Sequence, residues 1–117
     1  MNFDKWSIYK ANLDPIVGSE KGKSRPVLLI SENEINDLIK RVNVLTITSR
    51  KINRRIYPNE ALIEKGNFGL TNESIILSHQ IRTLDKSRQT YKYGVINDLE
   101  KQNEIFDSIC FQLGIEQ

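Results

Sequence analysis

Short runs of β-branched and aliphatic residues recur along the chain, separated by stretches rich in Gly, Pro, Asn and Asp. Such runs, bounded by turn-forming residues, predict β-strands. Several short strands at close spacing favour a small β-barrel. The expected strands cover residues 6–13, 27–30, 42–48, 61–63, 74–78 and 91–96, and residues 80–88 are expected to begin extended and end in a turn.

Two segments carry helical signals. Ser31 and Glu34 have the spacing of a capping box, so a short helix is expected there, with Ile35, Leu38 and Ile39 as its apolar face. A second helix is expected to start at Asn97 or Asp98 and to stop at Gly114. We interpret its apolar stripe as core or dimer packing rather than a binding groove; the stripe consists of Leu99, Phe106, Ile109, Cys110 and Leu113.

Length and composition favour one compact domain over residues 1–117, because 117 residues with 38% hydrophobic content are too few for two ordinary domains. The chain has no apolar run of roughly 18 residues and no signal-like start, so a cytoplasmic location is expected. Cys110 and His79 are the only residues of their types, which excludes an intrachain disulfide and a zinc cluster. We therefore expect no metal and no cofactor.

Charge is unevenly distributed, although the formal net charge is only +2. Residues 40–55 hold six basic residues and no acidic one, whereas residues 97–117 hold five acidic residues and one lysine. The basic segment can attract phosphate, and the acidic one stays solvated. Charge runs are also common as plain soluble surface, so the segment alone does not establish a nucleic-acid partner.

A polar, basic loop over residues 18–26 separates the first two expected strands. Its two glycines permit close approach of the backbone to a ligand, and Pro26 favours an extended Arg25 at the mouth of the second strand. The loop is not a phosphate-binding P-loop, because its glycines are four residues apart where that motif needs five. We interpret it as the working loop of the protein.

Three polar clusters leave the ends of expected strands, at residues 19–25, 46–49 and 79–82. If they converge, Arg25 can bind phosphate oxygens in two contacts and stabilise a phosphorane, and Thr48 can donate a hydrogen bond there. With RNA, the ribose 2′-hydroxyl can be the nucleophile, so neither a metal nor an enzyme nucleophile is required. Proton transfer stays open between Arg25, Glu20 and water. His79 suits acid–base work, but a lone histidine beside an apolar strand is more often a core or rim residue.

Three ordered blocks carry a resemblance to a known family. They are residues 13–31 with Gly18-Ser19-Glu20 and Arg25-Pro26-Val27, residues 45–49 with Leu45-Thr46-Ile47-Thr48-Ser49, and residues 80–88 with Gln80-Ile81-Arg82-Thr83. Together they resemble the MazF/PemK family of toxin endoribonucleases over nearly the whole chain. The resemblance implies a mainly β fold with α, a small SH3-like β-barrel (PemK/CcdB-like) with a short internal helix and a C-terminal helix.

The resemblance also implies a homodimer, a cognate MazE-like antitoxin, and ribosome-independent, metal-independent cleavage of single-stranded mRNA at short motifs. Such cleavage leaves a 2′,3′-cyclic phosphate or 3′-phosphate and a 5′-hydroxyl. The catalytic residues of the family fall on Arg25 and Thr48. Substrate contacts fall on, or are expected at, Ser19, Glu20, Lys21, Ser49, Arg50, Arg54, Gln80 and Arg82.

The sequence departs from the family pattern at two places. The usual Arg-Gly-Asp-Ile opening is Lys5-Trp6-Ser7-Ile8, and His79 stands where an acidic residue commonly precedes the glutamine. Other functions on the same fold are a CcdB-like gyrase poison, an RNA-binding barrel without catalysis, and a catalytically degenerate regulator. The C-terminal residues 114–117 lack the terminal signature of CcdB toxins.

Overall fold

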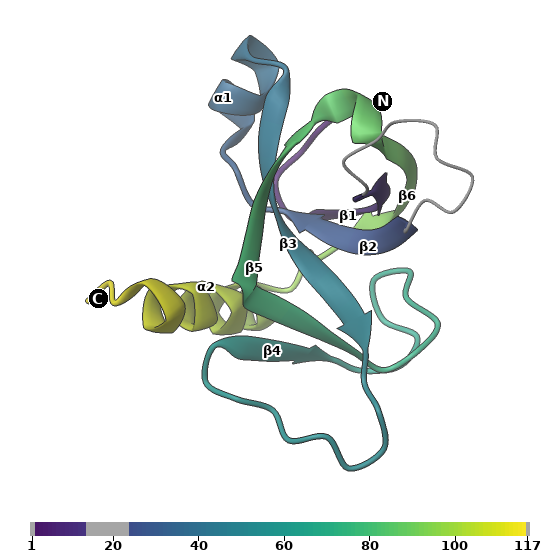
Figure 1. The fold of residues 1–117 in the computed structure, drawn as a ribbon, viewed down its shortest axis with the longest axis vertical. Helices are drawn as coiled ribbons and strands as arrows, with labels where there is room; N and C mark the ends of the chain where they lie inside the picture. The colour runs from purple at the N-terminus through teal and green to yellow at the C-terminus, as the bar shows by residue number, and fades with distance from the viewer. Residues whose placement is uncertain (1, 14–23, 117) are drawn as a thin grey trace.

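The computed structural model describes residues 2–13 and 24–116, and within them six antiparallel strands form one sheet in the order β4-β5-β3-β2-β1-β6 (Figure 1). The strands are β1 (Ser7–Asn12), β2 (Ser24–Leu29), β3 (Arg41–Ser49), β4 (Glu60–Ile63), β5 (Ser74–Asp85) and β6 (Gln89–Val95). The helices are α1 (Asn33–Leu38), the 3-10 turn η1 (Lys86–Arg88) and α2 (Leu99–Leu113). All six expected strands are therefore confirmed.

The sheet is curled but open, so the expected closed barrel is not confirmed. Its edges are β4, which pairs only with β5, and β6, which pairs only with β1. The strand β4 has only four residues and lies beside the first half of β5, while β6 lies at the opposite end of the strand order. The described strands thus leave these two edges unpaired with each other.

A bulge of three inserted residues divides β5 into two halves. Leu45 of β3 pairs with Ile81 and the next residue, Thr46, pairs with Leu77, so Ser78, His79 and Gln80 are inserted on the β5 side. The sequence predicted a strand ending at Ser78 followed by a separate extended segment. The structure instead has one strand of 12 residues, because the ladder with β3 resumes after the insertion.

Two apolar cores form on opposite faces of the sheet, as alternation along each strand requires. One core lies under α2 and is made by Ile8, Leu28, Leu45, Ile47, Ala61, Ile63, Leu70, Ile76, Ile96 and Ile105. The other lies inside the curl of the sheet and is made by Tyr9, Ala11, Val27, Leu29, Val42, Val44 and Leu84. Figure 1 shows α2 lying along the side of the sheet close to β4 and β5.

Helix α2 has the caps that the sequence predicts. The Asp98 carboxylate accepts a hydrogen bond from the Glu100 amide at 3.2 Å, and Gly114 ends the helix with a left-handed φ of 68°. The predicted apolar stripe is divided between core and surface in the single chain, and its dimer alternative stays a prediction. Ile109 and Cys110 pack inward, but Leu99, Phe106 and Leu113 are exposed, and the buried face also includes Lys101, Ile105 and Ser108.

The capping box and apolar face predicted for α1 are both wrong. The Ser31 hydroxyl donates to the Asn36 side-chain oxygen at 2.6 Å and accepts from the Asn43 amide, so it is not available as a cap. Asn36 is fully buried, and its amide nitrogen donates to the carbonyls of Phe3 and Ser31. Since Asn36 anchors the inner side, the predicted apolar side chains Ile35, Leu38 and Ile39 face solvent.

Candidate functional site

Arg25 lies within β2, as its second residue, rather than in a loop before the strand. It pairs with Ala11 of β1, and Pro26 pairs with Lys10, because the fixed φ of proline suits an extended strand. The Arg25 side chain is exposed and forms no hydrogen bond or ion pair with any residue that the structure describes. Among the described residues, none competes with an anionic ligand for this guanidinium group.

Thr48 lies at the same end of the β2–β3 pair as Arg25. Val27 pairs with Thr46 in this antiparallel ladder, so two steps back along β2 and two steps forward along β3 lead to Arg25 and Thr48. Both steps are even, so the two residues share one face of the sheet. On that face Thr46 is buried, and its hydroxyl has no hydrogen-bond partner among the described residues.

The other predicted site residues come from the segment between β1 and β2, the last residue of β3 (Ser49), the segment after it, and β5. Ser19, Glu20 and Lys21 lie outside the described residues. Arg82 pairs with Val44, four residues from Thr48 along β3 and therefore about 13 Å away at the level of the backbone. The Arg82 guanidinium donates to the Leu13 carbonyl at 3.1 Å, and Leu13 follows Asn12, the β1 residue that pairs with Ser24. The Arg82 side chain therefore extends toward the end of β2 that carries Arg25, although its backbone lies farther along the sheet.

Gln80 and His79 are exposed on the β5 bulge, with their side-chain nitrogens 3.5 Å apart. Ser78, the third bulge residue, is buried, and its hydroxyl lies 2.6 Å from that of Ser108 on α2. The Ser78 amide also donates to the Asn59 carbonyl. The bulge is thus fixed to α2 and to the loop before β4.

The basic loop (residues 50–59, between β3 and β4) is folded around its own arginines. Arg50 donates to Glu73 at 3.1 Å and twice to the Arg54 carbonyl, at 2.9 and 2.7 Å. Arg54 forms a bidentate pair with the two Glu60 oxygens, at 2.9 and 2.7 Å. The predicted contacts Arg50 and Arg54 therefore have carboxylate partners within the chain, and Glu60 is a partner that the sequence analysis missed.

Glu60 is the buried anchor of this loop, because only 3% of its side chain is exposed. Its carboxylate also accepts a hydrogen bond from the Tyr57 amide at 2.9 Å. The Arg54 hydrogen bonds, assisted by the Tyr57 amide, lower the pKa of Glu60 below its ordinary value despite the opposing effect of burial. The same pairing raises the pKa of Arg54. Both groups are therefore charged at neutral pH.

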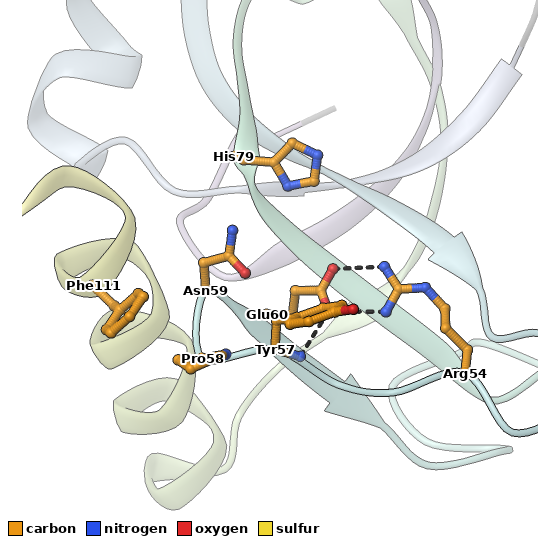
Figure 2. A pocket seen from close by; sticks show the side chains of 7 residues that line it. All are labelled: Arg54, Tyr57, Pro58, Asn59, Glu60, His79 and Phe111. Carbon is orange, nitrogen blue, oxygen red and sulfur yellow. Dashed lines mark hydrogen bonds and ion pairs between the residues drawn. The ribbon is translucent and has the colours of Figure 1, made fainter.

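A cavity of about 480 Å³ opens beside this ion pair (Figure 2). It is lined by Arg54, Tyr57, Pro58, Asn59, Glu60, His79 and Phe111, which come from the basic loop, β4, the bulge and α2. We call it the Tyr57 pocket. The sequence analysis named neither Asn59 nor Phe111, because the two come from segments 52 residues apart whose proximity no local pattern indicates.

Two absences apply to the described residues only. No group of three or more His, Cys, Asp or Glu side chains lies close enough together to hold a metal ion. Among residues 2–13 and 24–116, no helix has the length and apolar character that crossing a membrane requires.

Solved structures share this fold over almost the full chain. An endoribonuclease in complex with its cognate antitoxin from Mycobacterial species superposes with a TM-score of 0.79 at 20% identity, covering 97% of each chain. MazF (Form-I) from Deinococcus radiodurans superposes with a TM-score of 0.72 at 24% identity, covering 95% of this chain and 96% of that one. At these identities the likeness shows the fold.

Sequence relatives show more than the fold. Residues 4–110 match the family described as PemK-like, MazF-like toxin of type II toxin–antitoxin system. A protein named endoribonuclease MazF from Staphylococcus saprophyticus is 40% identical over 108 residues, which are 92% of this chain and 88% of the relative. These matches show that the chain belongs to the PemK-like, MazF-like toxins of type II toxin–antitoxin systems, as a MazF-type endoribonuclease.

Proposed function

We propose that the chain is a sequence-specific, ribosome-independent mRNA interferase that cuts single-stranded RNA without a metal ion. Residues 1–117 act as a single toxin domain in the cytoplasm, and a cognate MazE-like antitoxin inhibits it. The substrate supplies its own nucleophile, so the protein has to bind the scissile phosphate, stabilise the charge that develops on it and manage two protons.

The proposed reaction starts with attack of the ribose 2′-oxygen on the adjacent phosphorus. The bond from O2′ to phosphorus forms, the bond from phosphorus to O5′ breaks, and a 2′,3′-cyclic phosphate and a 5′-hydroxyl result. The 2′-hydroxyl proton passes to Glu20 or to water, and O5′ receives a proton from Arg25 or from water. Subsequent addition of water to the cyclic product gives a 3′-phosphate.

Arg25 and Thr48 have the catalytic roles in this proposal. The Arg25 guanidinium binds two non-bridging phosphate oxygens and stabilises the phosphorane, and Thr48 donates a hydrogen bond to the same centre. The observation that carries the proposal is the register of β2 and β3, in which both residues lie at one end and on one face. The exposed Arg25 has no carboxylate partner among the described residues, as an anion-binding group requires.

The substrate contacts are proposed at Ser19, Glu20, Lys21, Ser49, Arg50, Arg54, Gln80 and Arg82. Within this set, Arg50 and Arg54 act mainly by shaping the basic loop, since each is bound to a carboxylate of the chain. The neighbouring Lys51 and Arg55 are exposed and form no ion pair with a described residue, so they supply most of the loop's free positive charge.

A homodimer and an antitoxin complex are proposed on a separate basis. Helix α2 and the segment after it expose large apolar side chains that a lone chain leaves in water, namely Phe106 and Leu113 of the helix and Ile115 beyond it. The mycobacterial endoribonuclease of the same fold was solved with its cognate antitoxin. Apolar surface of this kind is typical of a protein that binds another chain.

The decisive experiment is incubation of the purified protein with a long unstructured RNA in excess EDTA, followed by mapping of the fragment ends. We expect discrete cuts with 5′-hydroxyl ends, and no cuts from Arg25→Ala. The absence of cuts by folded protein would support a binding-only poison or a degenerate toxin instead. Cuts that require added metal would refute the metal-independent mechanism.

A further inference from the structure

We propose that the Tyr57 pocket binds one unstacked nucleobase of the RNA and prefers a base with an amino group, namely adenine, cytosine or guanine, over uracil. This inference rests on the proposed function, because it assigns one substrate position to the same RNA-cleaving surface. It makes Tyr57 and Asn59 specificity-determining residues, which the sequence motifs do not identify.

The pocket lies on the sheet face that carries the proposed catalytic pair. Glu60 of β4 pairs with Leu77 of β5, and Leu77 pairs with Thr46 of β3, so these three side chains share a face. Thr46 is two residues from Thr48 on that same face. Two inter-strand steps place Glu60 about 10 Å from β3. A short stretch of single-stranded RNA can therefore reach both the pocket and Arg25.

Aromatic groups of the pocket are exposed in the way that base stacking requires. Tyr57 is 49% exposed and Phe111 is 65% exposed, and both line the cavity (Figure 2). The Arg55 guanidinium carbon lies 5.2 Å from the centre of the Tyr57 ring. Unstacked bases in protein-bound RNA are commonly held against aromatic rings and arginine planes. The Tyr57 and Arg55 pair thus supplies a stacking platform beside a cavity of about 480 Å³.

The Asn59 side chain offers the pocket a hydrogen-bond acceptor, whereas the terminal nitrogens of Arg54 already donate within the chain. The Asn59 amide nitrogen donates to the Gln112 side-chain oxygen at 2.8 Å, which leaves the Asn59 oxygen as the free end of that side chain. The Glu60 carboxylate already accepts three hydrogen bonds from Arg54 and Tyr57, and only 3% of its side chain is exposed, so the Asn59 oxygen is the acceptor that faces a ligand. An exocyclic amino group can donate to this oxygen, whereas uracil has no amino group and its one ring N–H on that edge is flanked by two carbonyl oxygens that face the acceptor unfavourably.

The pocket is held in shape by contacts outside it. Asn59 is fixed by Gln112 of α2 and by its own carbonyl, which accepts from the Ser78 amide. Ser78 is in turn bonded to Ser108 of α2. A preformed site loses little ordering entropy on binding, so it can discriminate between bases instead of adapting to each of them.

The test measures binding and cleavage separately. Fluorescent oligoribonucleotides with a 2′-deoxyribose at the cut site, identical except for one base beside it, are titrated with wild type, Tyr57→Ala, Tyr57→Phe and Asn59→Leu. We expect wild type to bind at least one amino-bearing series about tenfold tighter than the uracil series, which is the discrimination that hydrogen bonding to a base edge provides. Tyr57→Ala should lose most of the affinity for the preferred oligoribonucleotide, and Tyr57→Phe should keep it. Asn59→Leu should bind the amino-bearing and uracil oligoribonucleotides more equally.

Tyr91→Ala is the matched control, because Tyr91 is an exposed aromatic residue on β6 outside the pocket. Equal binding of all four bases by wild type, or unchanged preference in folded Tyr57→Ala and Asn59→Leu, would overturn the pocket assignment while leaving cleavage at Arg25 intact. Dissociation of Tyr57→Ala into monomers with unchanged base preference would overturn it in favour of a contact between copies. Failure of the wild type to cut RNA would instead count against the proposed function.

Discussion

Arg25 and Arg54 are both arginines of a MazF-type toxin, but they differ in whether other residues of the chain bind their guanidinium groups. Arg54 is bound through both of its terminal nitrogens to a buried carboxylate, and it also donates to the Arg55 carbonyl. Arg25 is exposed on a strand and has no partner among the described residues. The difference separates an arginine that orders a loop from one that is open to a ligand, a distinction that counting positive charges does not make.

Truncation of the two arginines should therefore affect different quantities, the cleavage rate for Arg25 and the stability for Arg54. This is the largest effect we expect. Arg25→Ala should lower the cleavage rate by about a thousandfold or more, because the phosphorane loses its charged donor. Its free energy of unfolding should stay within about 0.5 kcal/mol of wild type. Arg54→Ala should show the reverse pattern, with a larger loss of stability and, at saturating RNA, a much smaller loss of rate. Single-turnover kinetics measure the cleavage rate, and urea titrations measure the free energy of unfolding. Equal rate losses in both variants would contradict the proposed difference between the two arginines.

Thr48 sharpens the comparison from the catalytic side. Thr48→Ala should lower the single-turnover rate by about a hundredfold, as loss of one neutral hydrogen-bond donor to a developing charge does. Thr48→Ser keeps the hydroxyl and should retain most of the rate. A serine variant as slow as the alanine variant would show that the methyl group, and not the hydroxyl, matters at this position.

Glu60 tests the structural side of the comparison. Glu60→Ala removes the acceptor of three hydrogen bonds, two of them from a charged group, and should lower the free energy of unfolding by about 2 kcal/mol. Glu73→Ala is the matched control, because the Arg50–Glu73 pair is more exposed and should contribute less than about 1 kcal/mol. Urea unfolding measures both variants, and equal losses would mean that burial of Glu60 does not strengthen its pair.

The free charges of the basic loop should govern salt dependence. Lys51→Ala combined with Arg55→Ala should weaken RNA binding and make the slope of log Kd against log salt shallower by about 1 to 1.5, as removal of two contacts to single-stranded phosphates predicts. Anisotropy titrations at several salt concentrations give the slope. An unchanged slope would place the RNA path away from this loop.

The smallest expected effect is a pH dependence of stability. Since the pKa of Glu60 is lowered in the folded protein, its ionised form stabilises the fold fully above its ordinary pKa of 4.5, and this contribution is lost as the pH falls through the lower folded value. The difference in unfolding free energy between wild type and Glu60→Gln should therefore shrink from neutral pH to about pH 3. A difference that stays constant over this range would contradict the assignment.

The sequence predicts the strands well because β-branched runs and turn residues act locally. It predicts α1 poorly, since Ser31 and Glu34 have capping-box spacing but a buried Asn36 captures the Ser31 hydroxyl. The periodicity of Ile35, Leu38 and Ile39 identifies an apolar face, but nothing in it reveals whether another element covers that face. Here none of the described elements buries it.

The candidate site is predicted in part for the same reason. The motif blocks predict Arg25 and Thr48 as catalytic residues, and the register of β2 and β3 gives these two residues a common end. The partners of Arg50 and Arg54 could not be predicted, because Glu73 lies 23 residues from Arg50 and Glu60 lies in a separate strand. The Tyr57 pocket could not be predicted from the sequence, because it forms only where α2 packs beside the loop before β4.

The bulge in β5 separates two exposed residues from the hydrogen-bonded ladder of the sheet. Leu77 and Ile81 are four residues apart, yet they pair with consecutive residues of β3, so the insertion carries His79 and Gln80 outside the ladder. Substitutions at these two exposed positions can alter the surface offered to a ligand without shifting either half of the strand. The surface at this bulge can therefore be changed by substitution while the β3–β5 ladder, and the residues that it positions, stay in place.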